Sequence, residues 1–448
     1  MIVARRSTAS VRPYFAARAA RVAGGVRPSP RRSRGGLLRV ALACGLLCGA
    51  MPTAFAQDLL PTARELRAAG LETAWWGVAS VAAGRGRVTE LTADEDAVYV
   101  QTTGNLLTAI DLTTGAKKWV TRVGRAGQTA VRVNTTPGGE TEPGLVIIGV
   151  GRTAYAVNKD SGEIEWELPL AETAGAPLTI AQTDDGPRLF VPTVTGNVYC
   201  YDLDLIEEFH LEQRLAEFSS GTERWRYDTS APIVGPVAVD GIAAVFANNQ
   251  GALFGLSTEK RKLLWRFETN GRATAPLVAY EGTAYLASED RNLYAVNIQN
   301  GLDRWEFVTR EPVQIPPAIV KGAVYVTPVR SGVYRVDRDT GRSIWRAERA
   351  KGFLTQTADR VYLSDRADNV VALNLADGRQ VGSARLTQFK VRAQNPLTDR
   401  VIVATETGIV LCLKPAGAGF PIYYAHPERR PVEPAFAEEA PADPPAGN

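Results

Sequence analysis

The sequence predicts an all-β protein, an eight-bladed β-propeller of four-stranded antiparallel blades closed by an N-terminal strand. Short runs of alternating apolar residues, such as 284–287 and 293–296, indicate strands. Four such strands per repeat favour a propeller over a solenoid, whose units carry fewer strands or a helix. The repeat itself shows as a tryptophan every 40 residues, at Trp225, Trp265, Trp305 and Trp345.

A turn motif closes most repeats. In Asn297…Gly301…Trp305 a polar residue is followed by Gly four positions later and by Trp eight positions later. The polar side chain can bond the turn backbone, Gly takes the positive φ, and Trp can wedge between neighbouring sheets. In the seventh repeat Gly382 stands where Trp is expected. The structural repeat tryptophans are therefore Trp119, Trp166, Trp225, Trp265, Trp305 and Trp345.

The first 56 residues predict a secretory signal peptide. They contain ten Arg and no acid, and Leu37–Gly49 is apolar except for Arg39. Ala54-Phe55-Ala56 then offers a small-residue cleavage site before Gln57. A membrane anchor is the alternative, but the apolar run is shorter than the roughly 18–20 uninterrupted residues that an anchor needs.

The remaining chain divides into a lead-in at 57–70, the propeller at 71–416 and a Pro- and acid-rich tail at 417–448, which we expect to be disordered. A 16-residue insertion at 205–220 interrupts the third blade. The segment 71–78 reads as a strand without preceding partners, and the eighth repeat has only three strands. Joining the two would complete a blade and remove two exposed sheet edges.

Charge and cysteine content bear on the class of partner and on the presence of a disulfide. Removal of the ten leader arginines leaves 41 basic and 48 acidic residues, a formal charge of −7, which gives no support for a nucleic-acid partner. Cys200 and Cys412 remain, at the same position of two distant repeats. We therefore expect free, buried thiols rather than a disulfide.

The motif of Asp or Asn, Gly and Trp, preceded by Leu-Tyr-Ala-Val-Asn at 293–297, resembles the repeat of the pyrroloquinoline-quinone-like propeller superfamily. The resemblance covers essentially the whole mature chain. Within that superfamily, the size, the export signal and the eight blades are similar to the BamB-like outer-membrane assembly factors. This resemblance implies an exported, monomeric scaffold of the periplasm or outer-membrane periphery, without a membrane span, whose partners are envelope proteins, including an outer-membrane assembly component.

Members of that family are lipoproteins, but Cys44 and Cys48 are poor sites for lipid attachment. The superfamily also contains quinoprotein dehydrogenases with adjacent cysteines and a calcium set of Glu, Asn and Asp, and neither feature can be matched here. His210 and His426 are the only histidines, so we expect no His-based metal site or catalytic triad. We expect no enzyme, cofactor or metal; a quinone-dependent dehydrogenase and a small-ligand or carbohydrate-binding propeller are the alternatives.

Two features are candidate sites. The insertion carries Phe209, Leu211, Leu215 and Phe218 among acidic residues, which predicts an amphipathic helix that either covers the blade edge or binds a partner. Arg335 occupies a slot that is Ala, Gly or Cys in the other seven repeats. A buried Arg needs a partner, so it is either a candidate channel charge facing an acidic ligand or a locally paired charge.

Overall fold

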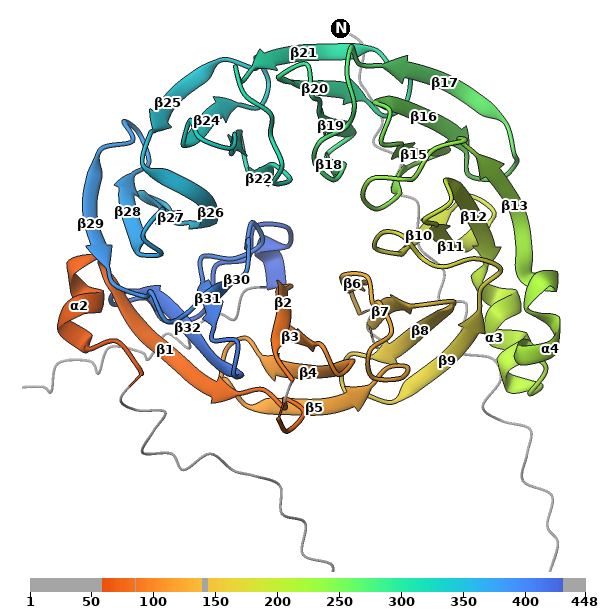
Figure 1. Cartoon of the computed structure of the whole chain (residues 1–448), viewed down its shortest axis with the longest axis horizontal. Helices are drawn as coiled ribbons and strands as arrows, with labels where there is room; N and C mark the ends of the chain where they lie inside the picture. Colours follow the sequence, from red (N-terminus) through yellow and green to blue (C-terminus); the bar gives the residue numbers. More distant parts are fainter. Residues whose placement is uncertain (1–58, 85, 139–143, 430–448) are drawn as a thin grey trace, which may run out of the picture.

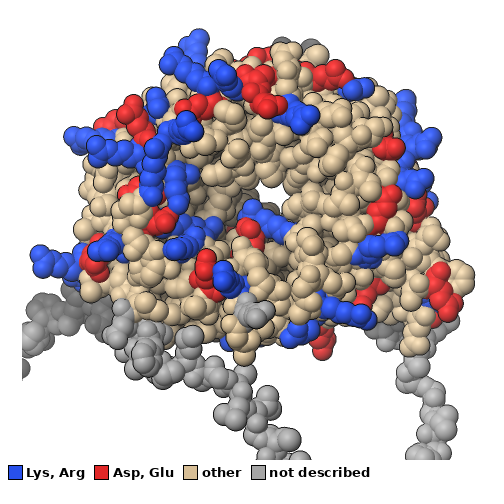
Figure 2. Space-filling view, viewed as in Figure 1, with Lys and Arg blue, Asp and Glu red and all other residues tan. Residues whose placement is uncertain are grey.

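The computed structural model describes residues 59–84, 86–138 and 144–429, so the predicted signal peptide lies outside the described residues. Its strands form eight four-stranded antiparallel sheets, arranged as the blades of a ring (Figure 1). The space-filling view shows an open channel at the centre of the ring (Figure 2). The predicted eight-bladed propeller is confirmed.

In blades 1 to 7 the chain runs from the innermost strand to the outermost strand. Blade 1 consists of β2 (Val88–Ala93), β3 (Ala97–Thr102), β4 (Leu106–Asp111) and β5 (Lys117–Arg122), and blade 2 of β6 (Asn134–Thr135), β7 (Leu145–Val150), β8 (Thr153–Asn158) and β9 (Ile164–Pro169). Blade 3 consists of β10 (Thr179–Thr183), β11 (Gly186–Pro192), β12 (Asn197–Asp202) and β13 (Glu223–Asp228), and blade 4 of β14 (Ala238–Asp240), β15 (Ala243–Ala247), β16 (Ala252–Ser257) and β17 (Leu263–Glu268).

Blade 5 consists of β18 (Val278–Tyr280), β19 (Thr283–Ala287), β20 (Asn292–Asn297) and β21 (Asp303–Val308). Blade 6 consists of β22 (Ala318–Val320), β23 (Ala323–Val326), β24 (Val333–Asp337) and β25 (Ser343–Ala347). Blade 7 consists of β26 (Ala350–Gln356), β27 (Arg360–Asp365), β28 (Val370–Asn374) and β29 (Gln380–Ala384). The cores lie between neighbouring blades. Tyr99 of blade 1, for example, is fully buried in one cluster with Val146 and Ile148 of blade 2.

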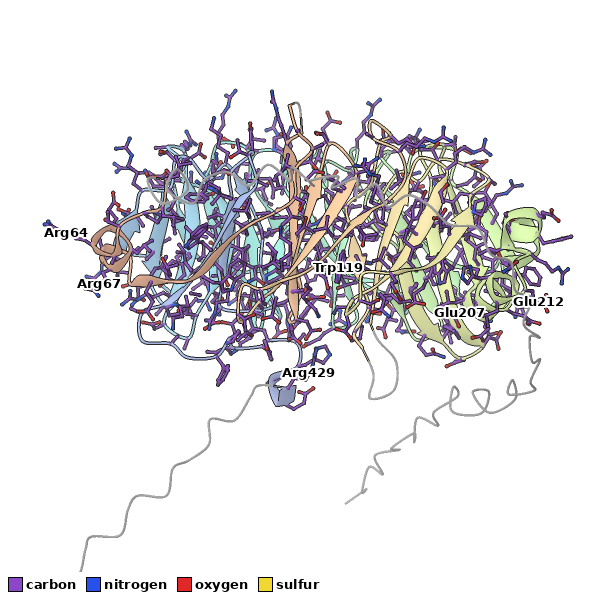
Figure 3. The ribbon with its side chains drawn as sticks, turned by 90° about the horizontal axis from the view of Figure 1, so that it is seen from below. Arg64, Arg67, Trp119, Glu207, Glu212 and Arg429 are labelled. Atoms are coloured by element: carbon purple, nitrogen blue, oxygen red, sulfur yellow. The ribbon has the colours of Figure 1, made fainter. Side chains whose placement is uncertain are left out.

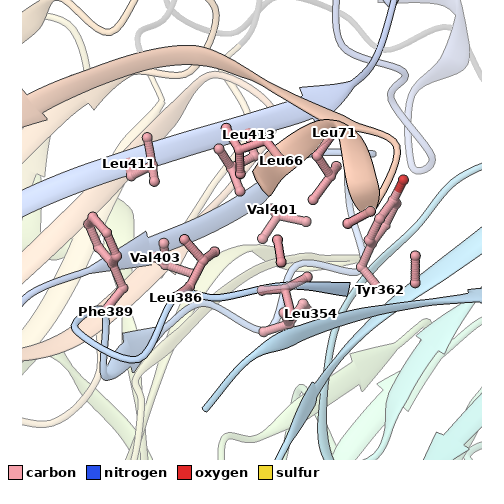
Figure 4. Packing of buried hydrophobic residues seen from close by; sticks show 14 of the residues in the cluster. Leu66, Leu71, Leu354, Tyr362, Leu386, Phe389, Val401, Val403, Leu411 and Leu413 are labelled. Carbon is pink, nitrogen blue, oxygen red and sulfur yellow. The ribbon is translucent and has the colours of Figure 1, made fainter. Parts of the chain in front are cut away.

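The ring closes as predicted. Blade 8 takes β30 (Val391–Arg392), β31 (Val401–Ala404) and β32 (Ile409–Pro415) from the C-terminal end and β1 (Leu71–Val78) from the N-terminal end. The helix α2 (Ala63–Ala68) precedes β1 and packs Leu66 against this closure (Figure 4). Gly382, which replaces the tryptophan of blade 7, leaves room for the backbone of Ala68.

The loops of the ring lie on two faces. The connections between blades and the turns between second and third strands form one face, which we call the upper face. It faces the viewer in Figures 1 and 2 and points up in Figure 3. The lower face carries the turns between first and second strands and between third and fourth strands.

A contact between blades repeats around the ring, and we call it the tryptophan clasp. At six blade boundaries, the indole Nε1 of a tryptophan on the outermost strand donates a hydrogen bond to a carbonyl in the turn before the outermost strand of the next blade. In blade 5, Trp305 donates to the Arg338 carbonyl of blade 6 at 2.7 Å. The other donors are Trp75, Trp119, Trp225, Trp265 and Trp345, at 2.7–3.1 Å.

The Gly of the turn motif is explained by the same contact. Gly341 has a φ of +69°, and a Cβ on it would lie 2.7 Å from the ring of Trp305. A side chain here would meet both a left-handed backbone conformation and the indole of the preceding blade. On its other side a tryptophan lies opposite the small slot of its own blade, as Trp265 pairs with Gly255, except that Trp345 pairs with Arg335.

Trp75 is the tryptophan of the closing strand and joins blade 8 to blade 1. Trp166 is the exception: among the described tryptophans, its buried Nε1 lacks a hydrogen-bond partner. Blade 3 replaces the acceptor turn by the insertion, so the indole of Trp166 packs against apolar side chains instead.

This difference yields a matched pair of variants. We expect Trp305→Phe to lower the free energy of unfolding by about 1–2 kcal/mol beyond Trp166→Phe, because it leaves a carbonyl without its donor. Trp166→Phe removes a donor that has no acceptor. Urea titrations of both variants measure the difference, and equal losses would contradict the clasp.

Closure by β1 also predicts a large effect. Deletion of 71–78 exposes the edge of β32 and removes the clasp of Trp75. We expect the loss in stability to exceed the roughly 3–5 kcal/mol of a single large core substitution. Calorimetry of the truncated chain measures it, and an unchanged melting temperature would exclude closure by this strand.

Candidate functional site

The insertion in blade 3 forms two short α-helices and one 3-10 helix at the rim. Asp202, the polar residue of this blade's turn motif, becomes the N-cap of α3 (Leu203–Leu211) and accepts a hydrogen bond from the Leu205 amide at 3.1 Å. Its carboxylate also pairs with Arg188 and Arg224. The helices α4 (Leu215–Phe218) and η1 (Ser219–Thr222) then return the chain to β13.

One side of this rim insertion belongs to the core. Leu203, Ile206 and Leu215 are buried in a cluster that contains Trp166. The prediction of one helix carrying all four apolar candidates was wrong, because Gln213 has a φ of +58° and separates α3 from α4. Leu215 therefore covers the blade edge rather than facing solvent.

The other side of the rim insertion is apolar and exposed. Leu211 is 81% exposed and Phe218 is 44% exposed. The guanidinium of Arg214 lies over the rings of Phe218 and of half-buried Phe209, 4.7 and 5.3 Å from their centroids. Exposed aromatic and aliphatic side chains beside an Arg are typical of the centres of protein interfaces. Figure 3 shows the insertion projecting from the edge of the disk opposite α2.

Arg335 lies between blades rather than on the channel. It belongs to β24, the third strand from the channel. Its Nη1 donates to the Leu375 carbonyl at 3.2 Å, the acceptor that also receives the Trp345 indole. Its Nε has no partner among the described residues. Arg335 is thus held between blades 6 and 7 by a backbone carbonyl, on the third strand from the channel.

The C-terminal segment 417–429, which we call the strap, is ordered and crosses the lower face, so the tail prediction was wrong for these residues. Tyr423 is 9% exposed, and the amide of Tyr424 donates to the Leu397 carbonyl at 2.8 Å. Near its end, His426 Nδ1 lies 2.8 Å from Glu95 Oε2. Apolar burial and ion pairing thus hold a segment whose composition is typical of disorder. Residues 430–448 lie outside the described residues.

An ion-pair network joins the strap to blades 1 and 2 around a pocket of about 350 Å³. Lys159 lies 2.7 Å from Asp94 and 2.9 Å from Asp96, and Arg429 lies 2.6 Å from Asp96. Burial raises the pKa of Asp96, but Lys159 and Arg429 outweigh it, so this pKa lies below its usual range. The ion pair between Arg429 and Asp96 fastens the strap, and Lys159 compensates the charge of Asp94 and Asp96. The acidic run 94–96 was the sequence signal for this network.

The two cysteines are free and lie under tryptophans of different blades. Cys200 pairs with Trp225, and Cys412 pairs with Trp75. The prediction of separate buried thiols is confirmed. Burial raises the pKa of each thiol to about 12.

In the described part of the chain, no group of three or more His, Cys, Asp and Glu side chains could hold a metal ion. His210 is exposed on α3, far in the chain from His426 on the strap. No helix of the described residues is long and apolar enough to cross a membrane.

The eight four-stranded blades, joined at six boundaries by the tryptophan clasp, define a propeller of the pyrroloquinoline-quinone-like class. The sequence model of the family described as outer membrane protein assembly factor BamB matches residues 72–204, 211–328 and 271–414. The chain belongs to this family. Residues 205–210, which lie in α3, fall between the matched ranges.

Solved structures show the same fold at low identity. BamB from Moraxella catarrhalis is 16% identical, with a TM-score of 0.56 over 77% of this chain and 99% of that chain. The computationally designed Ika8 protein is 11% identical, with a TM-score of 0.57 over 74% and 98%. The C-terminal WD40 domain of Sif2 is 12% identical, with a TM-score of 0.58 over 77% and 98%. No curated protein sequence matches the chain significantly.

The raised thiol pKa values give a prediction for chemical modification. At pH 8 only about one thiol in ten thousand is ionised at a pKa of 12, and both are buried, so a disulfide reagent should not label the folded mature chain. In denaturant without reductant the same reagent should count two thiols. A count of zero, with a peptide that joins Cys200 to Cys412, would contradict the placement in separate blades.

Proposed function

We propose that the mature chain is an exported, non-catalytic scaffold that binds envelope proteins during the assembly of outer-membrane proteins. Membership of the BamB family supports this role. The leader-like first 56 residues support export to the periplasm or to the periphery of the outer membrane. The rigid ring would hold partner-binding loops at fixed positions, which is the usual division of labour between scaffold and loops.

The observation that carries the proposal is the exposed apolar side of the rim insertion. Its buried residues fasten it to blades 2 and 3. Leu211 and Phe218 are left in solvent, where their exposure has no role in closing the ring. A fixed, amphipathic helical element of this kind fits the groove of a partner protein. We therefore assign Leu211 and Phe218, with Arg214 beside them, as the contact site, supported by Phe209 and Leu215 from below.

A crosslinking experiment tests this assignment. A photoreactive residue placed at Glu212 should crosslink the mature chain to an outer-membrane assembly component in envelope extracts. The change Leu211→Ser/Phe218→Ser should reduce the product at least about tenfold, since interface hot spots contribute about 2 kcal/mol or more each. Its melting temperature should stay nearly unchanged because both side chains are exposed.

The matched control is Leu263→Ser/Leu302→Ser, which removes two exposed leucines at 42% and 65% exposure from blades 4 and 5. This control should retain the crosslink. Equal crosslinking by both variants, or a product without any envelope assembly component, would contradict the assignment. Dye reduction by the chain after addition of the quinone and calcium would contradict the non-catalytic part of the proposal.

A further inference from the structure

Charge is divided between the two faces of the ring. The turns between first and second strands, on the lower face, are mostly acidic: Asp94, Glu95, Asp96, Asp184, Asp185, Asp240, Glu281, Asp359 and Asp399. The upper face over blades 5 to 7 carries exposed arginines in six successive loops and turns. These residues, which we call the arginine face, are Arg272, Arg291, Arg310, Arg330, Arg349 and Arg366. Figure 2 shows basic side chains gathered over the top and left of the ring, where Figure 1 places these blades.

Carboxylates of this region are used inside the loops, whereas among the arginines only Arg366 is, because its Nη2 donates a hydrogen bond to the Arg330 carbonyl. Glu311 accepts a hydrogen bond from the Arg330 amide at 2.8 Å. Asp290 accepts one from the Tyr294 hydroxyl at 2.7 Å, and Asp368 pairs with Lys351 and lies 4.0 Å from Arg392. No guanidinium of the arginine face makes an ion pair with a carboxylate of the described residues. The positive charge therefore remains available to a partner.

Two of these arginines occupy strained backbone positions. Arg291 has a φ of +73° and Arg310 has a φ of +62°. At the position of Arg291, just before the third strand, four other blades have Gly196, Gly251, Gly332 and Gly408, all with positive φ. A left-handed conformation is easier for Gly than for Arg. The sequence thus places long cationic side chains at loop tips where the backbone conformation favours Gly. Such backbone strain points to a function of these side chains.

Exposed apolar side chains lie among the cations. Val329, next to Arg330 in the same turn, is 52% exposed. Val308, at the upper end of the outermost strand of blade 5, is 65% exposed, and Ile315 in the following loop is 40% exposed. Basic side chains stand separately along the upper edge of the disk (Figure 3). They are spread over three blades rather than gathered around one cavity.

We propose that the arginine face docks the ring onto an anionic membrane surface through phospholipid phosphate groups. A plane of phosphates can meet all the separated loop tips at once, and guanidinium groups bind phosphate in a bidentate manner. The neighbouring valines and isoleucine can enter the interfacial region of the bilayer. Acidic turns of the lower face, at 184–185 and at Asp240, are repelled by the same surface, which would favour docking through the upper face.

Vesicle binding by the chain starting at Gln57 tests this inference, which goes beyond the proposed function and does not involve the rim partner. The protein should cosediment with vesicles of phosphatidylglycerol and phosphatidylcholine but not with phosphatidylcholine alone. Binding should fall as salt rises, because exposed charges are screened. The triple variant Arg291→Gly/Arg310→Asn/Arg330→Gln should bind at least about tenfold more weakly, since each Arg near such a surface contributes several-fold. Gly and Asn suit positive φ, so its melting temperature should not fall.

The matched control is Lys260→Gln/Arg261→Gln/Lys262→Gln, which removes the same charge from an exposed turn of the lower face. The control should bind vesicles like the unchanged protein. Equal losses in both variants would overturn the proposal in favour of a net-charge effect. Failure of the unchanged protein to bind anionic vesicles at low salt would also overturn it, and retention on polyglutamate in that case would indicate an acidic protein partner instead.

Discussion

The tryptophan clasp is the contact on which the ring depends. A blade alone is a single sheet with both faces exposed, so its stability comes from packing against the neighbouring blades. An indole fills that interface, and its Nε1 satisfies a turn carbonyl of the next blade, as between Trp305 and Arg338. The turn Gly of one blade lies against the indole of the tryptophan on the preceding blade. The Gly and the Trp of the repeated motif therefore meet in one contact across the blade boundary.

Places where the clasp changes are also the places where the ring has additional elements. Blade 3 lacks the acceptor turn, and the rim insertion packs apolar side chains around Trp166 instead. Blade 7 lacks the tryptophan, and Gly382 gives its space to α2 from the lead-in. Once the ring is rigid, its surface can differ from one region to another. The insertion presents apolar side chains at the rim, and the loops of blades 5 to 7 present unpaired arginines on the upper face.

Family membership and the structure contribute differently to the functional argument. The family supports a scaffold of outer-membrane protein assembly. Structures at 11–16% identity show the propeller fold alone. The candidate site therefore depends on this chain's own geometry, above all on the exposure of Leu211 and Phe218 against the burial of Leu215. Periodicity within 205–220 could predict helix, but it could not predict which of these side chains are buried and which are exposed. The left-handed conformation of Gln213 ends the first helix, and the second helix then runs in a different direction.

The sequence by itself determined the number of blades, the turn chemistry and the closing strand, because each depends on hydrogen bonds and alternating burial within one repeat. The small slot opposite the tryptophan was also visible, since Gly, Ala and Cys recur there. Only the tertiary structure decided the contacts between repeats. It placed Arg335 beside Leu375 and brought His426 to Glu95 across 331 residues of sequence. It also brought the six arginines of the arginine face onto one side of the ring, because a turn's face follows from its place in the blade and not from its own residues.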